Sequence, residues 1–120
     1  MWEYILSVED AQQAFSNFSG QICFVGHSHL PIFFIRDEQG QYRETLGPRV
    51  PLQAGFRHIV NVGSVGQPRD GNPNASYLLF DDTEKWLELK RVPYELRRTQ
   101  EKMQAAGLPY YLAARLAVGR

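Results

Sequence analysis

Two of the three histidines in this 120-residue chain, His27 and His29, lie two residues apart and directly follow an apolar run at residues 22–25. The end of a rigid strand is a common place for functional side chains. In extended backbone, residues i and i+2 point to the same side, with their α-carbons about 7 Å apart. This spacing suits one imidazole on each of two metal ions about 3.5–4 Å apart better than chelation of one ion.

The same pair of histidines has a simpler interpretation. Imidazole is a common metal ligand, but a histidine beside an apolar segment is often packed or hydrogen-bonded in the protein interior. The spacing of His27 and His29 leaves both interpretations open. Two neutral imidazoles also cannot complete a dinuclear hydrolytic centre, because each metal ion needs several protein ligands and an open water position.

A second segment that could do chemistry follows another apolar run and covers residues 61–73. Its three glycines and two prolines predict a long ordered loop instead of a helix or strand. Free backbone N–H groups in such a loop, together with Arg69, are suited to an oxyanion such as phosphate. A tight structural connection between two core strands is the alternative.

These two segments together resemble the calcineurin-like metallophosphoesterase superfamily. Residues 26–31, Gly-His-Ser-His-Leu-Pro, resemble its last metal-ligand motif. Residues 61–71 resemble the Asn-Pro-Gly-Ser-Val-Gly-Gln-Pro-Arg-Asp-Gly signature of its bacterial phosphodiesterase-like and diadenosine-tetraphosphatase-like branch, with Val62 in place of the proline. The resemblance runs along nearly the whole chain but covers only the C-terminal portion of a family member.

The resemblance implies a hydrolase that acts on phosphomonoesters or phosphodiesters with two divalent metal ions, drawn from manganese, iron, zinc or nickel. His27 would bind one metal ion and His29 the other. The residues that it implies for contacts with the phosphate-ester substrate are Asn61, Gly63, Ser64 and Arg69.

Four other motifs of the family are absent from this sequence: Asp-x-His, Gly-Asp-x-x-Asp, Gly-Asn-His-(Asp/Glu) and a further metal-binding histidine. No catalytic residue can therefore be assigned here with certainty, and we expect the chain alone to be inactive or nearly so. The alternatives are a non-catalytic interaction or regulatory remnant of the phosphoesterase fold, and an inactive truncated relic.

The composition predicts a polypeptide that folds in water. Thirteen basic and thirteen acidic side chains cancel, which gives no electrostatic footprint for nucleic acid. The single cysteine, Cys23, excludes a disulfide within the chain and is expected to be a core residue in a reducing compartment. The sequence shows neither a basic leader with a long apolar run nor a membrane-spanning segment, so we expect a cytoplasmic location.

The pattern of apolar residues predicts an α/β (α+β) fold in one structural unit over residues 1–120. The resemblance specifies the C-terminal half of a two-sheet β-sandwich flanked by helices. Ser7 is the expected N-cap of a first helix. The predicted elements are a helix to residue 18, a strand at 21–25, a hairpin at 32–35 and 42–46, a loop at 47–55, a strand near 59, a hairpin at 76–80 and 86–92, a helix at 94–106 and a short final helix from 109.

A sandwich that lacks one half should expose a strand edge and apolar side chains. We expect this at Phe24, Phe33, Phe34 and Ile35, and the expected occupants are an N-terminal half of the fold or a second copy of the chain. A further surface feature is a possible basic patch, for which an ordinary solvated helix face is the alternative. Its members are Arg91, Arg97, Arg98 and Lys102.

Overall fold

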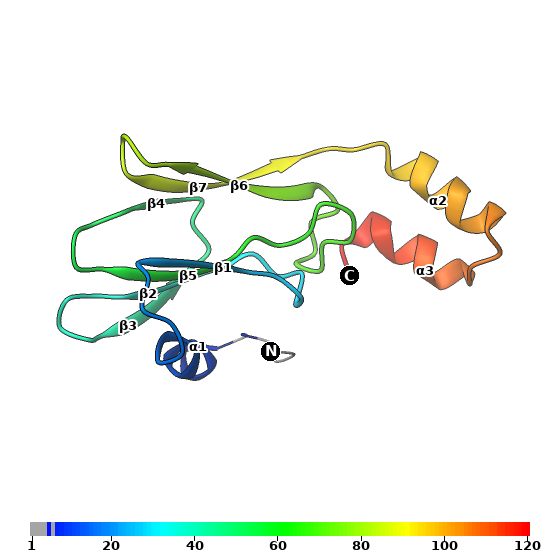
Figure 1. The fold of residues 1–120 in the computed structure, drawn as a ribbon. Coiled ribbons are helices and arrows are strands. Elements are labelled where there is room, and N and C mark those ends of the chain that lie inside the picture. Colours follow the sequence, from blue (N-terminus) through cyan, green and yellow to red (C-terminus); the bar gives the residue numbers. More distant parts are fainter. Residues whose placement is uncertain (1–4, 6) are drawn as a thin grey trace.

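The computed structural model describes Ile5 and residues 7–120, which form two stacked β-sheets with helices around them (Figure 1). The predicted α/β class is therefore confirmed. The first sheet has the strand order β1-β5-β2-β3, and the second has the order β4-β7-β6. The strands of the first sheet are β1 (Ile22–Val25), β2 (Ile32–Arg36), β3 (Tyr42–Thr45) and β5 (Arg57–Asn61), and those of the second are β4 (Arg49–Pro51), β6 (Ala75–Asp81) and β7 (Trp86–Val92).

Strands β1 and β5 are parallel, and all other pairs in the two sheets are antiparallel. The register places Phe24 opposite Val60 and Val25 opposite Asn61. Parallel neighbours end at the same edge of a sheet, so the loops after β1 and β5 begin side by side. These are the two loops that the sequence singles out for chemistry.

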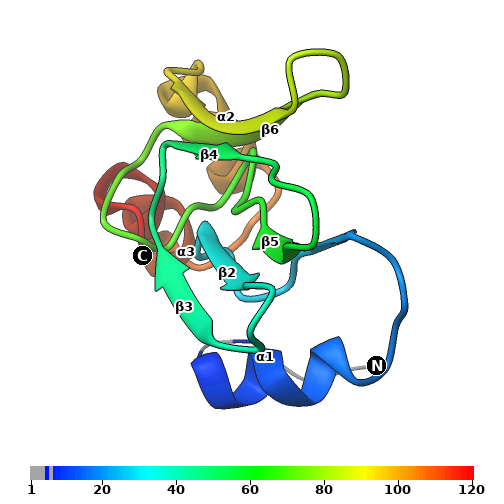
Figure 2. The same ribbon diagram turned by 90° about the vertical axis from the view of Figure 1, so that its left-hand side faces the viewer.

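The first sheet buries apolar side chains on both faces. On one face, Phe34 and Ile59 pack with Phe15 of helix α1 (Val8–Phe15). On the other, Phe33 and Val60 pack with Leu87 of the second sheet. Figure 2 shows the resulting layers, with α1 below the first sheet and the second sheet above it. This burial on both faces explains why β2 and β5 read as continuous apolar runs.

Helix α1 begins as the sequence predicts, because the Ser7 hydroxyl accepts a hydrogen bond from the Asp10 N–H at 3.2 Å. The helix ends at Phe15, three residues before the predicted end at 18, so that prediction was wrong. The guanidinium of Arg57 donates to the backbone carbonyls of Phe15, Phe18 and Gly20. The side chain of Arg57, which is distant in sequence, thus donates hydrogen bonds to carbonyl groups that a longer helix would have bonded internally.

The predicted loop at 47–55 contains the short strand β4, which the sequence analysis missed. Val50 is paired with Leu87 and is 3% exposed, so β4 exists because it covers the core and completes the second sheet. Pro48 precedes β4 and Pro51 is its last residue, and proline in a sequence argues against a strand. The hairpins at β2–β3 and β6–β7 agree with the predictions.

The remaining elements lie beyond one end of the sandwich (Figure 1). They are α2 (Leu96–Ala105), α3 (Tyr110–Ala114) and the 3₁₀ helix η1 (Arg115–Val118). Arg97 and Arg98 are exposed and pair with Glu101 and Glu95 on the same helix, which favours the solvated helix face over a basic patch. None of the helices within the described residues is long and apolar enough to cross a membrane.

The prediction of four exposed apolar residues was correct only for Phe24, which is 50% exposed. Phe33, Phe34 and Ile35 are each at most 1% exposed, because β2 lies inside the sheet between β5 and β3 and is covered on both faces. Cys23 is partly buried and packs toward α1, in agreement with a role in the core.

Candidate metal and phosphate site

The candidate site is formed by two loops at the carboxyl ends of β1 and β5. The N–H of Val62 donates to the carbonyl of Val25 at 3.2 Å, which joins the two strands at the point where both loops leave the sheet. Loops at the carboxyl ends of parallel strands are the usual location of ligand sites in α/β proteins. The structure therefore brings together the two segments that carry the predicted site residues.

The histidine loop has an unusual backbone. His27 has φ of 84° and His29 has φ of 61°, a left-handed region that residues with a Cβ rarely occupy. Backbone strain of this kind persists only where surrounding contacts enforce it, and it is concentrated at functional sites. Here the enforcing contacts come from the neighbouring loop.

Asn61 is the main brace between the two loops. Its side-chain amide donates to the Ser28 hydroxyl at 2.7 Å and to the Gly26 carbonyl at 3.3 Å, and its oxygen accepts from the Gly63 N–H at 3.0 Å. Asn61 and Ser28 are buried, at 0% and 4% exposed. These contacts give Asn61, a predicted phosphate contact, the role of holding the histidine loop against the strand ends.

The ring of His29 is oriented by the second loop. Its Nδ1 lies 2.8 Å from the carbonyl oxygen of Gln67, and the Arg69 N–H donates to the His29 carbonyl at 3.2 Å. A carbonyl only accepts, so Nδ1 carries the proton and Nε2 of the neutral ring keeps its lone pair. A backbone carbonyl on one ring nitrogen is the common arrangement behind a metal-binding histidine. His27, in the same loop, is exposed.

Two of the other predicted phosphate contacts, Gly63 and Ser64, determine the shape of the second loop. Gly63 has φ of 76°, and a Cβ there would lie 2.8 Å from the Ser76 hydroxyl, so the position requires glycine. The Ser64 hydroxyl accepts from the N–H groups of Gly66 and Gln67 and shapes the turn. These amides are used within the loop, which corrects the expectation that they are free to receive an oxyanion.

Arg69 is the predicted phosphate contact that keeps hydrogen-bonding capacity. Its guanidinium makes one long contact, 3.5 Å from Nη2 to the side-chain oxygen of Gln67. Its Nε is buried and has no hydrogen-bond partner among the described residues. A buried donor without an acceptor is costly unless a ligand or water completes it. Arg69 is thus the group in this loop best placed to take an anion.

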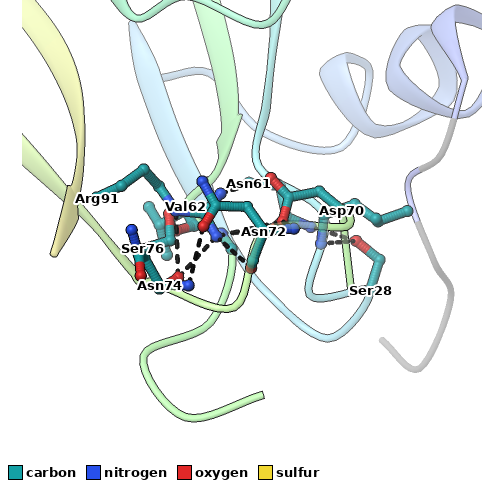
Figure 3. A network of polar contacts seen from close by, with 10 residues as sticks. Ser28, Asn61, Val62, Asp70, Asn72, Asn74, Ser76 and Arg91 are labelled. Atoms are coloured by element: carbon teal, nitrogen blue, oxygen red, sulfur yellow. Dashed lines mark hydrogen bonds and ion pairs between the residues drawn. The ribbon is translucent and has the colours of Figure 1, made fainter. Parts of the chain in front are cut away.

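Sequence reasoning missed the residues that fasten the second loop to the rest of the molecule. Arg91 on β7 forms an ion pair with Asp70 and donates to the carbonyls of Asn72 and Asn74, as Figure 3 shows. The hydroxyl of Tyr94 donates to the Gly66 carbonyl at 3.0 Å. Nothing in the local sequence identifies these contacts, because they join residues at least 17 positions apart.

The described residues provide only part of a metal site. They contain no cluster of three or more histidine, cysteine, aspartate or glutamate side chains that could hold a metal ion. The third histidine, His58, is 0% exposed within the sandwich, where burial and then the charge of Arg43 lower its pKa from 6.5 to about 4. The candidate donors among the described residues are therefore His27 and His29, which fit a metal centre as two of its ligands.

Comparisons with known proteins relate the fold of this chain to that of a metallophosphoesterase. No protein-family model matches the chain. Over all 120 residues the chain is 38% identical to the uncharacterized protein MJ0912 of Methanocaldococcus jannaschii, of which it covers 47%. It also superimposes on the crystal structure of a metallophosphoesterase from Sphaerobacter thermophilus with a TM-score of 0.90 and 39% identity, covering 100% of this chain and 51% of that one. The chain thus spans about half the length of both proteins.

Proposed function

We propose that this chain is the C-terminal portion of a calcineurin-like metallophosphoesterase and that it contributes the last metal-ligand motif to a site for hydrolysis of phosphate esters. The proposal is supported by the likeness to a metallophosphoesterase over the whole chain. The observation that carries it is the ring of His29, whose Nδ1 is engaged by Gln67 while Nε2 is left to bind a metal ion.

Each residue of the site has a distinct part in this proposal. His27 and His29 bind the metal ions, and Arg69 binds the phosphate group of the substrate. Asn61, Gly63 and Ser64 set the shape of the two loops. When bound, a pair of divalent metal ions supplies an activated water and stabilises the leaving oxygen of the ester. The remaining ligands must come from outside the described residues.

Nuclear magnetic resonance of the imidazole nitrogens tests the proposal on this chain alone. Without metal, we expect His29 to show the tautomer protonated at Nδ1. Addition of Zn²⁺ should shift the signals of His27 and His29, with weak affinity because only two ligands are present, and should leave the buried His58 unchanged.

The control for this titration is the double variant His27→Ala/His29→Ala, in which the Zn²⁺-dependent shifts of the surrounding loop amides should disappear. Zn²⁺ shifts that persist in the double variant, or that are absent from the wild-type histidines, would contradict the assignment of these residues as ligands.

A further inference from the structure

His29, Gln67 and Arg69 form a closed cycle of three contacts. The Nδ1–H of His29 donates to the carbonyl of Gln67 at 2.8 Å, and the N–H of Arg69 donates to the carbonyl of His29 at 3.2 Å. The third contact closes the cycle, because Nη2 of Arg69 lies 3.5 Å from the side-chain oxygen of Gln67. Gln67 therefore contacts the proposed metal ligand with its main chain and the proposed phosphate-binding group with its side chain.

The two contacts of Gln67 differ in strength. Its main chain is well fixed, since the Ser64 hydroxyl accepts from the Gln67 N–H at 2.9 Å and the next residue, Pro68, is fully buried with its φ restricted by the ring. The side-chain contact of 3.5 Å is at the long limit of a hydrogen bond and is correspondingly weak. The main chain of Gln67 thus holds the His29 ring firmly, whereas its side chain holds the Arg69 guanidinium loosely.

The guanidinium of Arg69 lies in a position that does not satisfy its donors. Nε and Nη2 share one edge of the planar group, and such an edge can bind two oxygens of a phosphate in parallel. On this edge Nε is buried without an acceptor among the described residues, and Nη2 makes the long contact to Gln67. A buried donor without an acceptor is unfavourable, so an anion that supplies acceptors to both nitrogens stabilises the arginine.

We infer that Gln67 is a positioning residue, which holds Arg69 in a ligand-free orientation and releases it to the phosphate group of the substrate. The inference rests on the proposed function for the identity of the ligand. Because Nε is buried, the guanidinium must turn outward before both nitrogens can face an anion, and this turn breaks the contact with Gln67. The neutral amide oxygen yields to phosphate, because hydrogen bonds to an ionised acceptor are roughly twice as strong.

Two substitutions of Gln67 should change the affinity for inorganic phosphate in opposite directions. Gln67→Glu replaces the amide by a carboxylate, which pairs with Arg69 and repels phosphate. We expect it to lower the affinity about tenfold, the effect of about 1.4 kcal/mol. Gln67→Met has a similar length but no oxygen, so it frees the guanidinium, and we expect the affinity to rise about twofold or more, as the loss of a weak competing hydrogen bond implies.

Nuclear magnetic resonance of the full chain, titrated with inorganic phosphate, measures these affinities at the Arg69 Nε–H. The same signal gives a readout without ligand, since its exchange with water should be slow in wild type and in Gln67→Glu and faster in Gln67→Met. The His29 tautomer should be the same in all three proteins, because it depends on the main-chain carbonyl of Gln67. Arg97→Met removes an exposed arginine paired with Glu101 and should leave the phosphate affinity unchanged.

Equal phosphate affinities in wild type, Gln67→Met and Gln67→Glu would overturn the inference. A lower affinity in Gln67→Met would also contradict it, because the contact would then assist anion binding. The same conclusion follows if neither wild type nor Gln67→Met shows phosphate-dependent shifts at Arg69, or if either substitution changes the His29 tautomer and so gives the side chain a role in loop structure. Failure of the proposed function has a separate signature, in which the Zn²⁺ shifts of His27 and His29 are missing while the order of phosphate affinities holds.

Discussion

At the scale of single residues, His58 is the side chain whose chemistry is most changed by the fold. It is 0% exposed, and neither ring nitrogen makes a hydrogen bond of normal geometry within the described part of the chain. Burial, followed by the charge of Arg43, lowers its pKa from 6.5 to about 4, and the backbone of Pro51 opposes this only in part. Between about pH 4 and pH 6.5, the folded protein therefore keeps His58 neutral, whereas the unfolded chain protonates it.

This difference in pKa predicts a loss of stability in mild acid. Between pH 6.5 and pH 4 the unfolded state binds more protons than the folded state, so the free energy of unfolding falls as the pH falls. At about 1.4 kcal/mol per pKa unit, we expect a loss on the order of 3 kcal/mol from this residue between pH 7 and pH 4. Urea unfolding at several pH values measures it.

His58→Leu is the matched variant, because it fills a similar space without a titrating group. Its stability should depend much less on pH over the same window. Equal pH dependence in wild type and His58→Leu would show that other groups cause the acid destabilisation.

At the scale of elements, the loop at residues 63–74 is a rigid structure because two distant parts of the chain hold it. Arg91 on β7 donates hydrogen bonds to the carboxylate of Asp70 and to the carbonyls of Asn72 and Asn74 in the loop. The carbonyl of Gly119, after η1, accepts from the N–H of Gly71 at 2.9 Å. The loop in turn orients His29 through Gln67. The orientation of the His29 ring thus depends on β7 and on the C-terminal turn.

Replacement of Arg91 should loosen this loop selectively. Arg91→Met keeps the length of the side chain but leaves Asp70 and the two carbonyls without their donor, and we expect faster hydrogen exchange at the Gly71 and Asn72 amides and a mixture of His29 tautomers. A bond to a charged group contributes about 1.5–3 kcal/mol, so the free energy of unfolding should fall by a similar amount. Native-state hydrogen exchange measures both effects.

The control for this prediction is Arg97→Met, because Arg97 is exposed and, within the described residues, forms its ion pair with Glu101 on its own helix. That variant should change neither the loop amides nor the His29 tautomer. An unchanged His29 signal in Arg91→Met would show that the loop holds its shape without the arginine.

A pair of glycines separates backbone strain from crowding at the C-terminal turn. Gly119 and Gly107 both have positive φ, 68° and 77°. A Cβ on Gly119 would lie 2.6 Å from the backbone nitrogen of Asn72, whereas one on Gly107 meets nothing within 4 Å. Gly107→Ala should therefore cost about 1–2 kcal/mol from the left-handed backbone alone, and Gly119→Ala clearly more. Thermal unfolding of the two variants measures the difference in stability. Equal losses of stability would show that the turn after η1 can move away from the Asn72 backbone at little cost.

At the scale of the whole molecule, the sandwich is complete at its core but open along one side. Phe33, Ile35 and Leu87 are fully buried between the sheets, while Phe24 and Phe80 on the edge strands β1 and β6 are half exposed. The proposed metal site is partial in the same way, because the described residues hold no cluster of three or more histidine, cysteine, aspartate or glutamate side chains that could hold a metal ion. Both features lie at the β1 edge, because Phe24 is on β1 and His27 follows the end of that strand.

The activity of the chain should follow from this incompleteness. With bis-p-nitrophenyl phosphate and Mn²⁺, we expect no turnover by the chain alone. We expect metal-dependent turnover by a single-chain fusion of this chain with the part of the Sphaerobacter thermophilus metallophosphoesterase that has no counterpart in it. His27→Ala/His29→Ala in the fusion should abolish that turnover, whereas His58→Leu should leave it unchanged at pH 7. Turnover by the chain alone that is lost in the double variant would show that it assembles a working site without another polypeptide.

The sequence by itself predicted the two loops of the candidate site and most of the strands around them. The histidine pair and the glycine- and proline-rich segment are local signals, because residue type and spacing there report directly on loop geometry and ligand chemistry. The hairpins around β2–β3 and β6–β7 and the N-cap at Ser7 are local in the same sense. The sequence also indicated the absence of the remaining metal motifs.

Only the tertiary structure decided which of these residues are exposed, braced or able to bind a ligand. Phe24 and Phe34 occupy similar apolar runs, yet one lies at an open edge and the other in the core, since strand order is set by pairing between distant segments. The end of α1 at Phe15, whose carbonyl accepts from Arg57, arises in the same way, as do the strand β4 over the core and the fastening of the loop by Arg91. Contacts between residues far apart in the chain leave no periodic signal, and for that reason they become visible only in the folded molecule.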